Sequence, residues 1–326
     1  MEKNITDNDV GDCKVEVKTQ PEFNNNMQKA DQKGNQLIFI IIGIIALIVL
    51  LVILLIVFVA FNRKDDKKLK YISTSKIPTI FDVDEGGDDL IAYTIANNSG
   101  KYDILDITTV HSSYCVDNVT DIWLRYLTYM NFDAKVYKGE NHPLIRKTEP
   151  TNFSHFYGMD FPNPTRKVES TSAVDFMYDT IKNYKTKVTL FLLGPSTNFA
   201  KVLQRDKTII DNVKEIIIMG GTRGKGNVAI NPKAEYNIYQ DADAASIIFN
   251  SGATIKVMGT DITSNLKLND EIYAKYLEMN TTSSILTYNL VKGTYQTWGD
   301  NIMHDPVTVL SHLNSNAVKL KSFLCS

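Results

Sequence analysis

The chain has 326 residues, 44% of them hydrophobic, and its 35 Lys and Arg residues nearly balance its 37 Asp and Glu residues. Because no basic stretch stands out beyond the segment that follows residue 61, these figures argue against nucleic-acid binding. The three cysteines, Cys13, Cys115 and Cys325, lack CxxC or CxxH spacing, which excludes a disulfide scaffold and a structural zinc site.

The N-terminal part of the chain divides into three segments by composition. Residues 1–36 are polar and show no apolar periodicity, which predicts a disordered tail. Residues 37–61 are uncharged and almost wholly apolar, and a helix of that length spans about 37 Å, enough to cross a bilayer. We therefore predict a single transmembrane helix and a membrane localisation. Residues 62–76 are predicted to form a charged juxtamembrane linker.

Two signals conflict over the side of the membrane on which the large C-terminal domain would lie. Lys and Arg residues are more numerous after the apolar run than before it, which favours a cytoplasmic domain. N-glycosylation sequons favour the opposite side. They begin at Asn97, Asn118, Asn152 and Asn280. The side is therefore left undetermined.

Residues 77–326 alternate short apolar runs with amphipathic stretches. This pattern predicts an α/β domain with a mainly parallel, Rossmann-like sheet flanked by helices. The predicted strands are Ile77–Phe81, Ile104–Val110, Lys135–Tyr137, Val188–Leu193, Glu215–Met219 and Thr254–Met258. The predicted helices are Asp89–Asn97, Asn118–Tyr129, Ala173–Asn183, Asn198–Gln204 and Ala242–Asn250. Ligands bind beyond the carboxyl ends of such strands, so the polar clusters there are candidate site residues.

Five carboxylates fall within eight residues, from Asp82 to Asp89, directly after the first predicted strand and before the first predicted helix. Like charges this close repel one another unless a cation lies among them. Oxygen ligands favour Ca²⁺ or Mg²⁺ over zinc. Gly86 and Gly87 let the chain bend so that Asp84 and Asp89 converge on one ion.

Three other interpretations of these carboxylates stay open at this point. An EF-hand loop expects a preceding helix and a Glu at its twelfth position, whereas a strand is predicted here and Tyr93 occupies that position. A phosphatase of the haloacid dehalogenase type expects Thr or Val where the chain has Gly86. A solvated acidic turn is disfavoured because Asp82 alternates inward with Ile80 and Asp84.

The segment from Asp82 to Asp89 resembles the DxDxGxDD signature of the inosine-uridine-preferring nucleoside hydrolase family. Four further blocks agree with that family in order and spacing. Leu193–Asn198 resembles its G-P-L-T-N turn, Met219–Asn227 its M-G-G…G-N strand end, Ala234–Asn237 its A-E-F-N block and His304–Pro306 its H-D-P block. Five blocks in family order make the resemblance specific.

The resemblance implies the nucleoside hydrolase fold and a calcium-dependent enzyme of nucleoside salvage that cleaves the N-glycosidic bond of ribonucleosides to free base and ribose. It implies Ca²⁺ ligands at Asp84, Asp89, the backbone carbonyl of Thr197, and Asp305. Asp84 would also be the general base, and His304 would protonate or polarise the leaving base. The residues implied to hold the ribonucleoside are Asp88, Met219, Asn227, Glu235 and Asn237. A homo-oligomer is left open.

The chain also departs from the family pattern. Ser113 stands where the family carries Asn, and residues 157–161 lack the histidine of its H-G-x-x-G loop. Twenty residues follow Pro306, whereas relatives continue further, so we expect a C-terminally truncated domain. These departures keep a second hypothesis open, a catalytically impaired membrane protein that binds calcium and ribosides without cleaving them.

Overall fold

The computed structural model describes residues 76–146, 159–265, 268–298, 303–319 and 321. The predicted tail at residues 1–36, the predicted span at residues 37–61 and all but the last residue of the predicted linker lie outside the described residues. The predicted membrane localisation is corrected, because no described helix combines the length and apolar character needed to cross a bilayer. The longest described helix has 17 residues, against about 20 apolar ones required for a span.

The described residues form an α/β fold around a six-stranded sheet whose paired strands all run parallel. The strand order is β3-β2-β1-β4-β5-β6. The strands are β1 (Ile77–Val83), β2 (Tyr102–Thr109), β3 (Val136–Lys138), β4 (Val188–Leu192), β5 (Val213–Met219) and β6 (Ile255–Met258). All six predicted strands are confirmed. The start of β2 is two residues earlier than predicted because Tyr102 pairs with Ile77.

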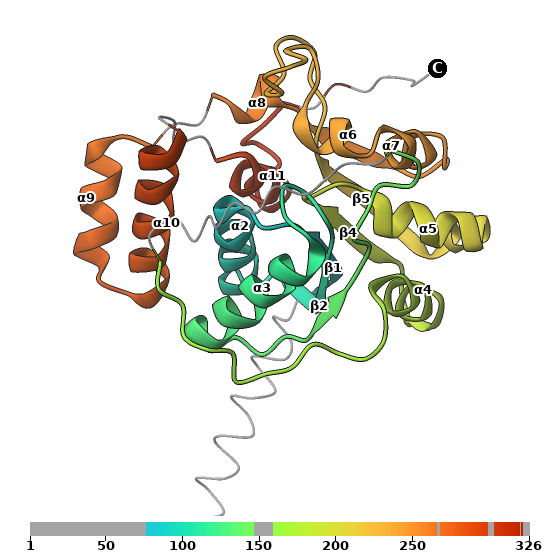
Figure 1. Cartoon of the computed structure of the whole chain (residues 1–326), viewed down its shortest axis with the longest axis horizontal. Helices are drawn as coiled ribbons and strands as arrows, with labels where there is room; N and C mark the ends of the chain where they lie inside the picture. The colour runs from blue at the N-terminus through green and yellow to red at the C-terminus, as the bar shows by residue number, and fades with distance from the viewer. Residues whose placement is uncertain (1–75, 147–158, 266–267, 299–302, 320, 322–326) are drawn as a thin grey trace, which may run out of the picture. The chain divides into compact units, whose positions relative to one another are not determined.

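Helices flank the sheet, and the five predicted ones are confirmed as α2 (Gly87–Asn98), α3 (Val116–Met130), α4 (Ala173–Asn183), α5 (Thr197–Arg205) and α7 (Ala242–Phe249). The elements that were not predicted are η1 (Lys207–Asn212), α6 (Tyr236–Gln240), α8 (Thr260–Thr263), α9 (Asp270–Met279), α10 (Thr282–Trp298) and α11 (His304–Leu313). Figure 1 shows α2 and α3 on one side of the sheet and α4 and α5 on the other.

Alternate residues of the central strands feed two separate hydrophobic cores. Phe81 and Phe191 point to the face covered by α2, α3, α10 and α11, and their rings stack with centroids 4.8 Å apart. Ile80, Leu190 and Ile216 point to the face covered by α4, α5 and α7. Both faces are buried, which explains why these strands are mostly apolar on both sides rather than alternating between apolar and polar residues. The parallel strands end at one edge of the sheet, where their following loops meet.

Candidate active site

The turn between β1 and α2 concentrates the acidic residues at the carboxyl edge of the sheet. Asp88 and Asp89 lie in the first turn of α2, where the partial positive charge of a helix N-terminus favours carboxylates. Gly86 leaves room for the acidic side chains, because a Cβ atom there would displace the carboxylates of Asp88 and Asp89. A strand precedes the cluster, so the EF-hand interpretation is wrong.

A third carboxylate joins this turn from the far end of the chain. Asp305 is the second residue of α11, and ligand atoms of Asp88, Asp89 and Asp305 all lie within 4.8 Å of one another. The carboxylate of Asp88 also accepts hydrogen bonds from the backbone N–H groups of His304 and Asp305, at 3.2 and 3.4 Å. The N-termini of α2 and α11 therefore converge on one acidic group. We call Asp88, Asp89 and Asp305 the acidic triad.

The electrostatics of the acidic triad fit a bound cation. Burial, and then the charge of Asp305, hold the pKa of Asp89 well above its ordinary value. Burial, and then the charge of Asp88, do the same to the pKa of Asp305. Among the described residues, Oδ1 of Asp305 is buried with no hydrogen-bond partner. Oxygen ligands with an unsatisfied buried carboxylate oxygen suit a hard divalent cation.

Asp84 lies beside the acidic triad, held by backbone contacts. Its carboxylate accepts from the N–H of Gly86 at 3.0 Å, and its own N–H donates to the carboxylate of Asp89 at 3.3 Å. Its carbonyl accepts from the indole N–H of Trp123 at 2.7 Å. Burial raises the pKa of the Asp84 carboxyl. Asp88, rather than the predicted ligand Asp84, completes the group of three ligand atoms.

Thr197 begins α5 after β4, and its side chain is fixed by two buried partners. Its hydroxyl donates to Asp241 at 2.7 Å, so it accepts from Nε2 of His111, 3.0 Å away. Burial lowers the pKa of His111 to about 4, which keeps the ring neutral at neutral pH. The sequence reasoning missed both partners. The only signal was His111 itself, next to the turn where the chain departs from the family pattern.

Three of the predicted substrate residues bind the backbone around the ends of β4 and β5. Glu235 caps α6, accepting from the N–H groups of Gly221, Asn237 and Ile238 at 2.9 to 3.0 Å. The side-chain amide of Asn237 donates to the carbonyls of Leu193 at 2.6 Å and Met219 at 3.1 Å. Glu235, Asn237 and Met219 are therefore held rigidly together.

The remaining predicted residues lie on loops and short helices. Asn227 is exposed and accepts from the N–H of Tyr236 at 2.8 Å. The ring of His304 hydrogen-bonds through Nδ1 to the hydroxyl of Thr263 on α8, at 2.6 Å. Ser113, which departs from the family, hydrogen-bonds to the hydroxyl of Tyr236 at 2.8 Å.

Glu85 is a further buried carboxylate in the turn, and the sequence reasoning gave it no role. Its Oε1 accepts from the N–H of Ser113 at 3.0 Å. Within the described part of the chain its Oε2 is buried without a hydrogen-bond partner. Burial, and then the charge of Asp84, hold the pKa of Glu85 well above its ordinary value.

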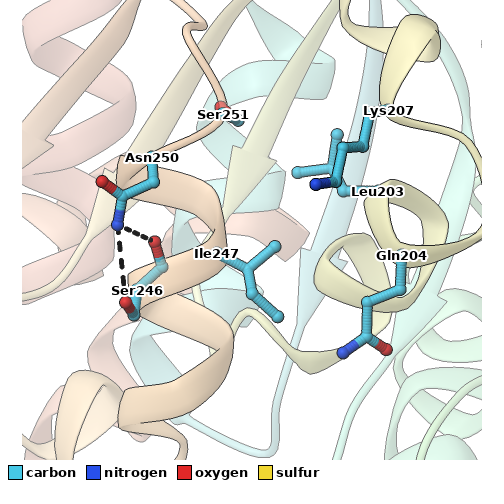
Figure 2. Close-up of a pocket in the computed structure, with 7 residues that line it drawn as sticks. All are labelled: Leu203, Gln204, Lys207, Ser246, Ile247, Asn250 and Ser251. Carbon is cyan, nitrogen blue, oxygen red and sulfur yellow. Dashed lines mark hydrogen bonds between the residues drawn. The ribbon is translucent and has the colours of Figure 1, made fainter.

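A cavity of about 390 Å³ lies elsewhere in the fold, between the ends of α5 and α7 (Figure 2). Its walls contain no carboxylate and no residue of the acidic triad. They are formed by Leu203, Gln204, Lys207, Ser246, Ile247, Asn250 and Ser251. This cavity therefore does not indicate the candidate site, whereas the chemistry of the carboxyl edge does.

Comparison with known proteins decides the family. Residues 79–325 match the family described as inosine-uridine preferring nucleoside hydrolase. The chain belongs to this family. It is therefore an enzyme of the class that hydrolyses the N-glycosyl bonds of nucleosides.

Individual nucleoside hydrolases resemble the chain over most of their length. Uridine nucleosidase 1 of Arabidopsis thaliana is 34% identical over 246 residues, 71% of this chain and 72% of the relative. Pyrimidine-specific ribonucleoside hydrolase RihB of Escherichia coli is 30% identical over 250 residues, 74% of this chain and 79% of the relative. The structure of a purine-preferring ribonucleoside hydrolase from Gardnerella vaginalis matches with a TM-score of 0.66 and 29% identity, covering 73% of this chain and 80% of that one.

Proposed function

We propose that this nucleoside hydrolase is calcium-dependent and releases free base and ribose from ribonucleosides in nucleoside salvage. The observation that supports a cation-dependent reaction is the acidic triad at the carboxyl edge of the sheet, in which Asp89 and Asp305 are buried, Asp88 is half-buried and one oxygen of Asp305 has no partner among the described residues. Carboxylate and carbonyl oxygens are the ligands that calcium takes in proteins.

The proposed calcium ligands are Asp84, Asp89, Asp305 and the backbone carbonyl of Thr197. Asp88 lies in the same group and orients α11 through the N–H groups of His304 and Asp305. When bound, the cation supplies positive charge that offsets the carboxylates and lowers the pKa of a water molecule. The Thr197 hydroxyl donates to Asp241 and accepts from His111, and these two hydrogen bonds support a fixed orientation of Thr197.

Asp84 and His304 are the proposed catalytic residues. Asp84 takes a proton from the attacking water as general base, and the bonds to Gly86 and Trp123 hold it in place for this step. Positive charge develops on the ribose as the glycosidic bond breaks, as in glycoside hydrolysis generally. His304 protonates or polarises the leaving base, with its ring oriented by Thr263.

The proposed substrate-binding residues surround the same edge. Asp88, Asn227, Glu235 and Asn237 hydrogen-bond to the ribose hydroxyls, and Met219 lies beside the sugar. The backbone bonds of Glu235 and Asn237 support this role, since a binding group fixed before substrate arrives loses little entropy on binding. The named relatives act on uridine, on pyrimidine or on purine ribonucleosides, so both base classes belong in the test.

A second candidate function is binding of ribosides and calcium without cleavage. The observation that favours it is Ser113, which replaces the family's Asn and hydrogen-bonds to Tyr236. A weakened sugar contact would lower the rate of the chemical step more than it lowers binding.

The assembly state of the protein also stays a prediction, to be measured by light scattering on the same sample.

The full-length protein tests these proposals. We expect release of ribose from uridine and inosine in calcium and none in excess chelator, measured as reducing sugar. A folded sample that releases no ribose with calcium present would contradict the proposed activity. Riboside binding by calorimetry without any turnover would instead support the second candidate. The variant D84A serves as the inactive control.

A further inference from the structure

Helix α11 connects the acidic triad to a second cluster of polar side chains at its other end. Asp305 is its second residue, and His312 lies in its last turn. Six residues of helix lie between them, so the two residues are about 10 Å apart along the axis. His312 is therefore too far away to touch a cation or substrate at Asp305. Its effect on the site can only be transmitted through the helix.

The ring of His312 is buried and hydrogen-bonded on both nitrogens. Nδ1 lies 2.7 Å from the hydroxyl of Tyr102, and Nε2 lies 3.2 Å from a carboxylate oxygen of Glu215. The other oxygen of Glu215 pairs with Lys256 at 2.5 Å. His312 and Glu215 have side-chain exposures of only 8% and 9%. We call His312, Tyr102, Glu215 and Lys256 the α11 anchor.

The anchor attaches α11 to most of the width of the sheet. Tyr102 is on β2, Glu215 on β5 and Lys256 on β6, while the ring of His312 also lies edge-on to Phe191 of β4, with centroids 5.6 Å apart. The ring stacks on Tyr102 with an interplanar angle of 22°. A displacement of α11 along its axis would break contacts with several strands at once, so the anchor fixes the position of the helix.

At the N-terminal end of α11, electrostatic repulsion favours displacement of the helix, whereas the anchor at the other end holds it in place. The buried carboxylates of Asp89 and Asp305 meet the half-buried carboxylate of Asp88 at the N-terminal end, and the mutual repulsion of like charges favours movement of Asp305 away from α2. The carboxylate of Asp88 accepts hydrogen bonds from the first N–H groups of α11 at 3.2 and 3.4 Å. The anchor holds the opposite end of the helix to the sheet, with Nδ1 of His312 2.7 Å from the hydroxyl of Tyr102, in addition to the packing of α11 against α2.

We infer that His312 is a positioning residue for the cation site, which holds Asp305 within reach of Asp88 and Asp89 by fixing α11 on the sheet. The inference rests on the proposed function in one respect, namely that Asp305 is a cation ligand. Residues that hydrogen-bond directly to metal ligands change metal affinity by about 10- to 100-fold, and the more distant His312 is expected at the lower end of that range. A histidine that only fills space in the core would lower stability without changing affinity in the folded protein.

Calcium titration of the full-length protein by calorimetry tests this role. We expect H312A to bind calcium about tenfold more weakly than the wild-type protein. H312Q should stay within about twofold, because its amide N–H can donate to Glu215 from a similar position. In steady-state assays over a range of calcium concentrations, H312A should reach a normal kcat at saturating calcium but need more calcium to do so.

Two further variants keep the test decisive. Met177 is buried in the core on the other face of the sheet, so M177A controls for a general loss of stability and should keep wild-type calcium affinity. If H312A does not fold, Y102F removes only the hydroxyl that meets Nδ1 and should weaken calcium binding in the same direction. Equal affinity of wild type and of every folded anchor variant overturns the inference alone. A wild-type protein that binds no calcium overturns the proposed cation site and this inference with it.

Discussion

Replacing Asp305 with asparagine should make the cation-free protein more stable. Its ligand oxygen lies within 4.8 Å of those of Asp88 and Asp89, and two unit charges at that distance repel by about 3.5 kcal/mol at an effective dielectric constant of about 20. Protonation relieves part of this repulsion, because the pKa of Asp305 is raised. We therefore expect D305N to gain about 2 kcal/mol, which corresponds to a Tm increase of about 4 to 8 °C for a domain of this size.

In calcium, the wild-type protein should become more stable than D305N. At a calcium concentration of about 100 times its Kd, the wild-type protein gains about 2.7 kcal/mol, whereas D305N has lost a ligand and gains little. The assay is thermal unfolding of both proteins at pH 7 in chelator and in calcium. D133N, which removes a fully exposed carboxylate, is the matched control and should follow the wild type in both conditions.

The pH dependence of the stability difference between D305N and the wild type gives an independent test of this repulsion. A carboxyl with a raised pKa costs stability only when it is ionised, so its cost is absent below the ordinary value of 3.8 and grows as the pH rises. The advantage of D305N in chelator should therefore disappear toward pH 4. Repulsion within the acidic triad is ruled out as a source of instability if cation-free D305N is less stable than the wild type at pH 7. Equal Tm increases for both proteins in calcium would rule out Asp305 as a ligand.

Three further predictions concern the surrounding residues. D84A should lose ribose release and bind calcium at least about tenfold more weakly, measured by turnover and calorimetry; unchanged turnover would rule out its role as the base. Burial lowers the pKa of His111 from 6.5 to about 4, so the wild type should lose stability as the pH falls from 6.5 to 4. In thermal melts over this pH range, H111Q should lack this part of the decline. E235A should destabilise the protein by about 2 kcal/mol in urea unfolding, because three N–H groups lose their acceptor, and a loss below about 0.5 kcal/mol would contradict the capping role.

The strands and the helices between them could be predicted because their apolar pattern is local. Val188–Leu192 is wholly buried, and its sequence is almost purely apolar with a β-branched start. The later helices carry a weaker pattern. Helix α9 has no buried residue, and α10 packs against both α9 and α2. Helix α11 begins with site residues rather than with an apolar repeat, so its sequence predicted catalytic and metal-binding residues but no helix.

The acidic turn was likewise predictable, since Asp84, Asp88 and Asp89 are close in sequence and lie between a strand and a helix. The contact of Asp305 with them follows from the family blocks alone, because more than 200 residues intervene. The partners of His111 and His312 could not be predicted at all. Each of these rings meets side chains from distant elements, and no local pattern carries such a contact.

In the proposed reaction, hydrolysis of the N-glycosidic bond requires a cation held at the acidic triad. This requirement is tested by the calcium dependence of uridine and inosine turnover by the wild-type protein and by D305N, with base and ribose measured together. We predict equal release of base and ribose that rises with calcium to saturation in the wild type and stays near zero for D305N over the same range. Turnover by the wild type that excess chelator leaves unchanged would contradict the account.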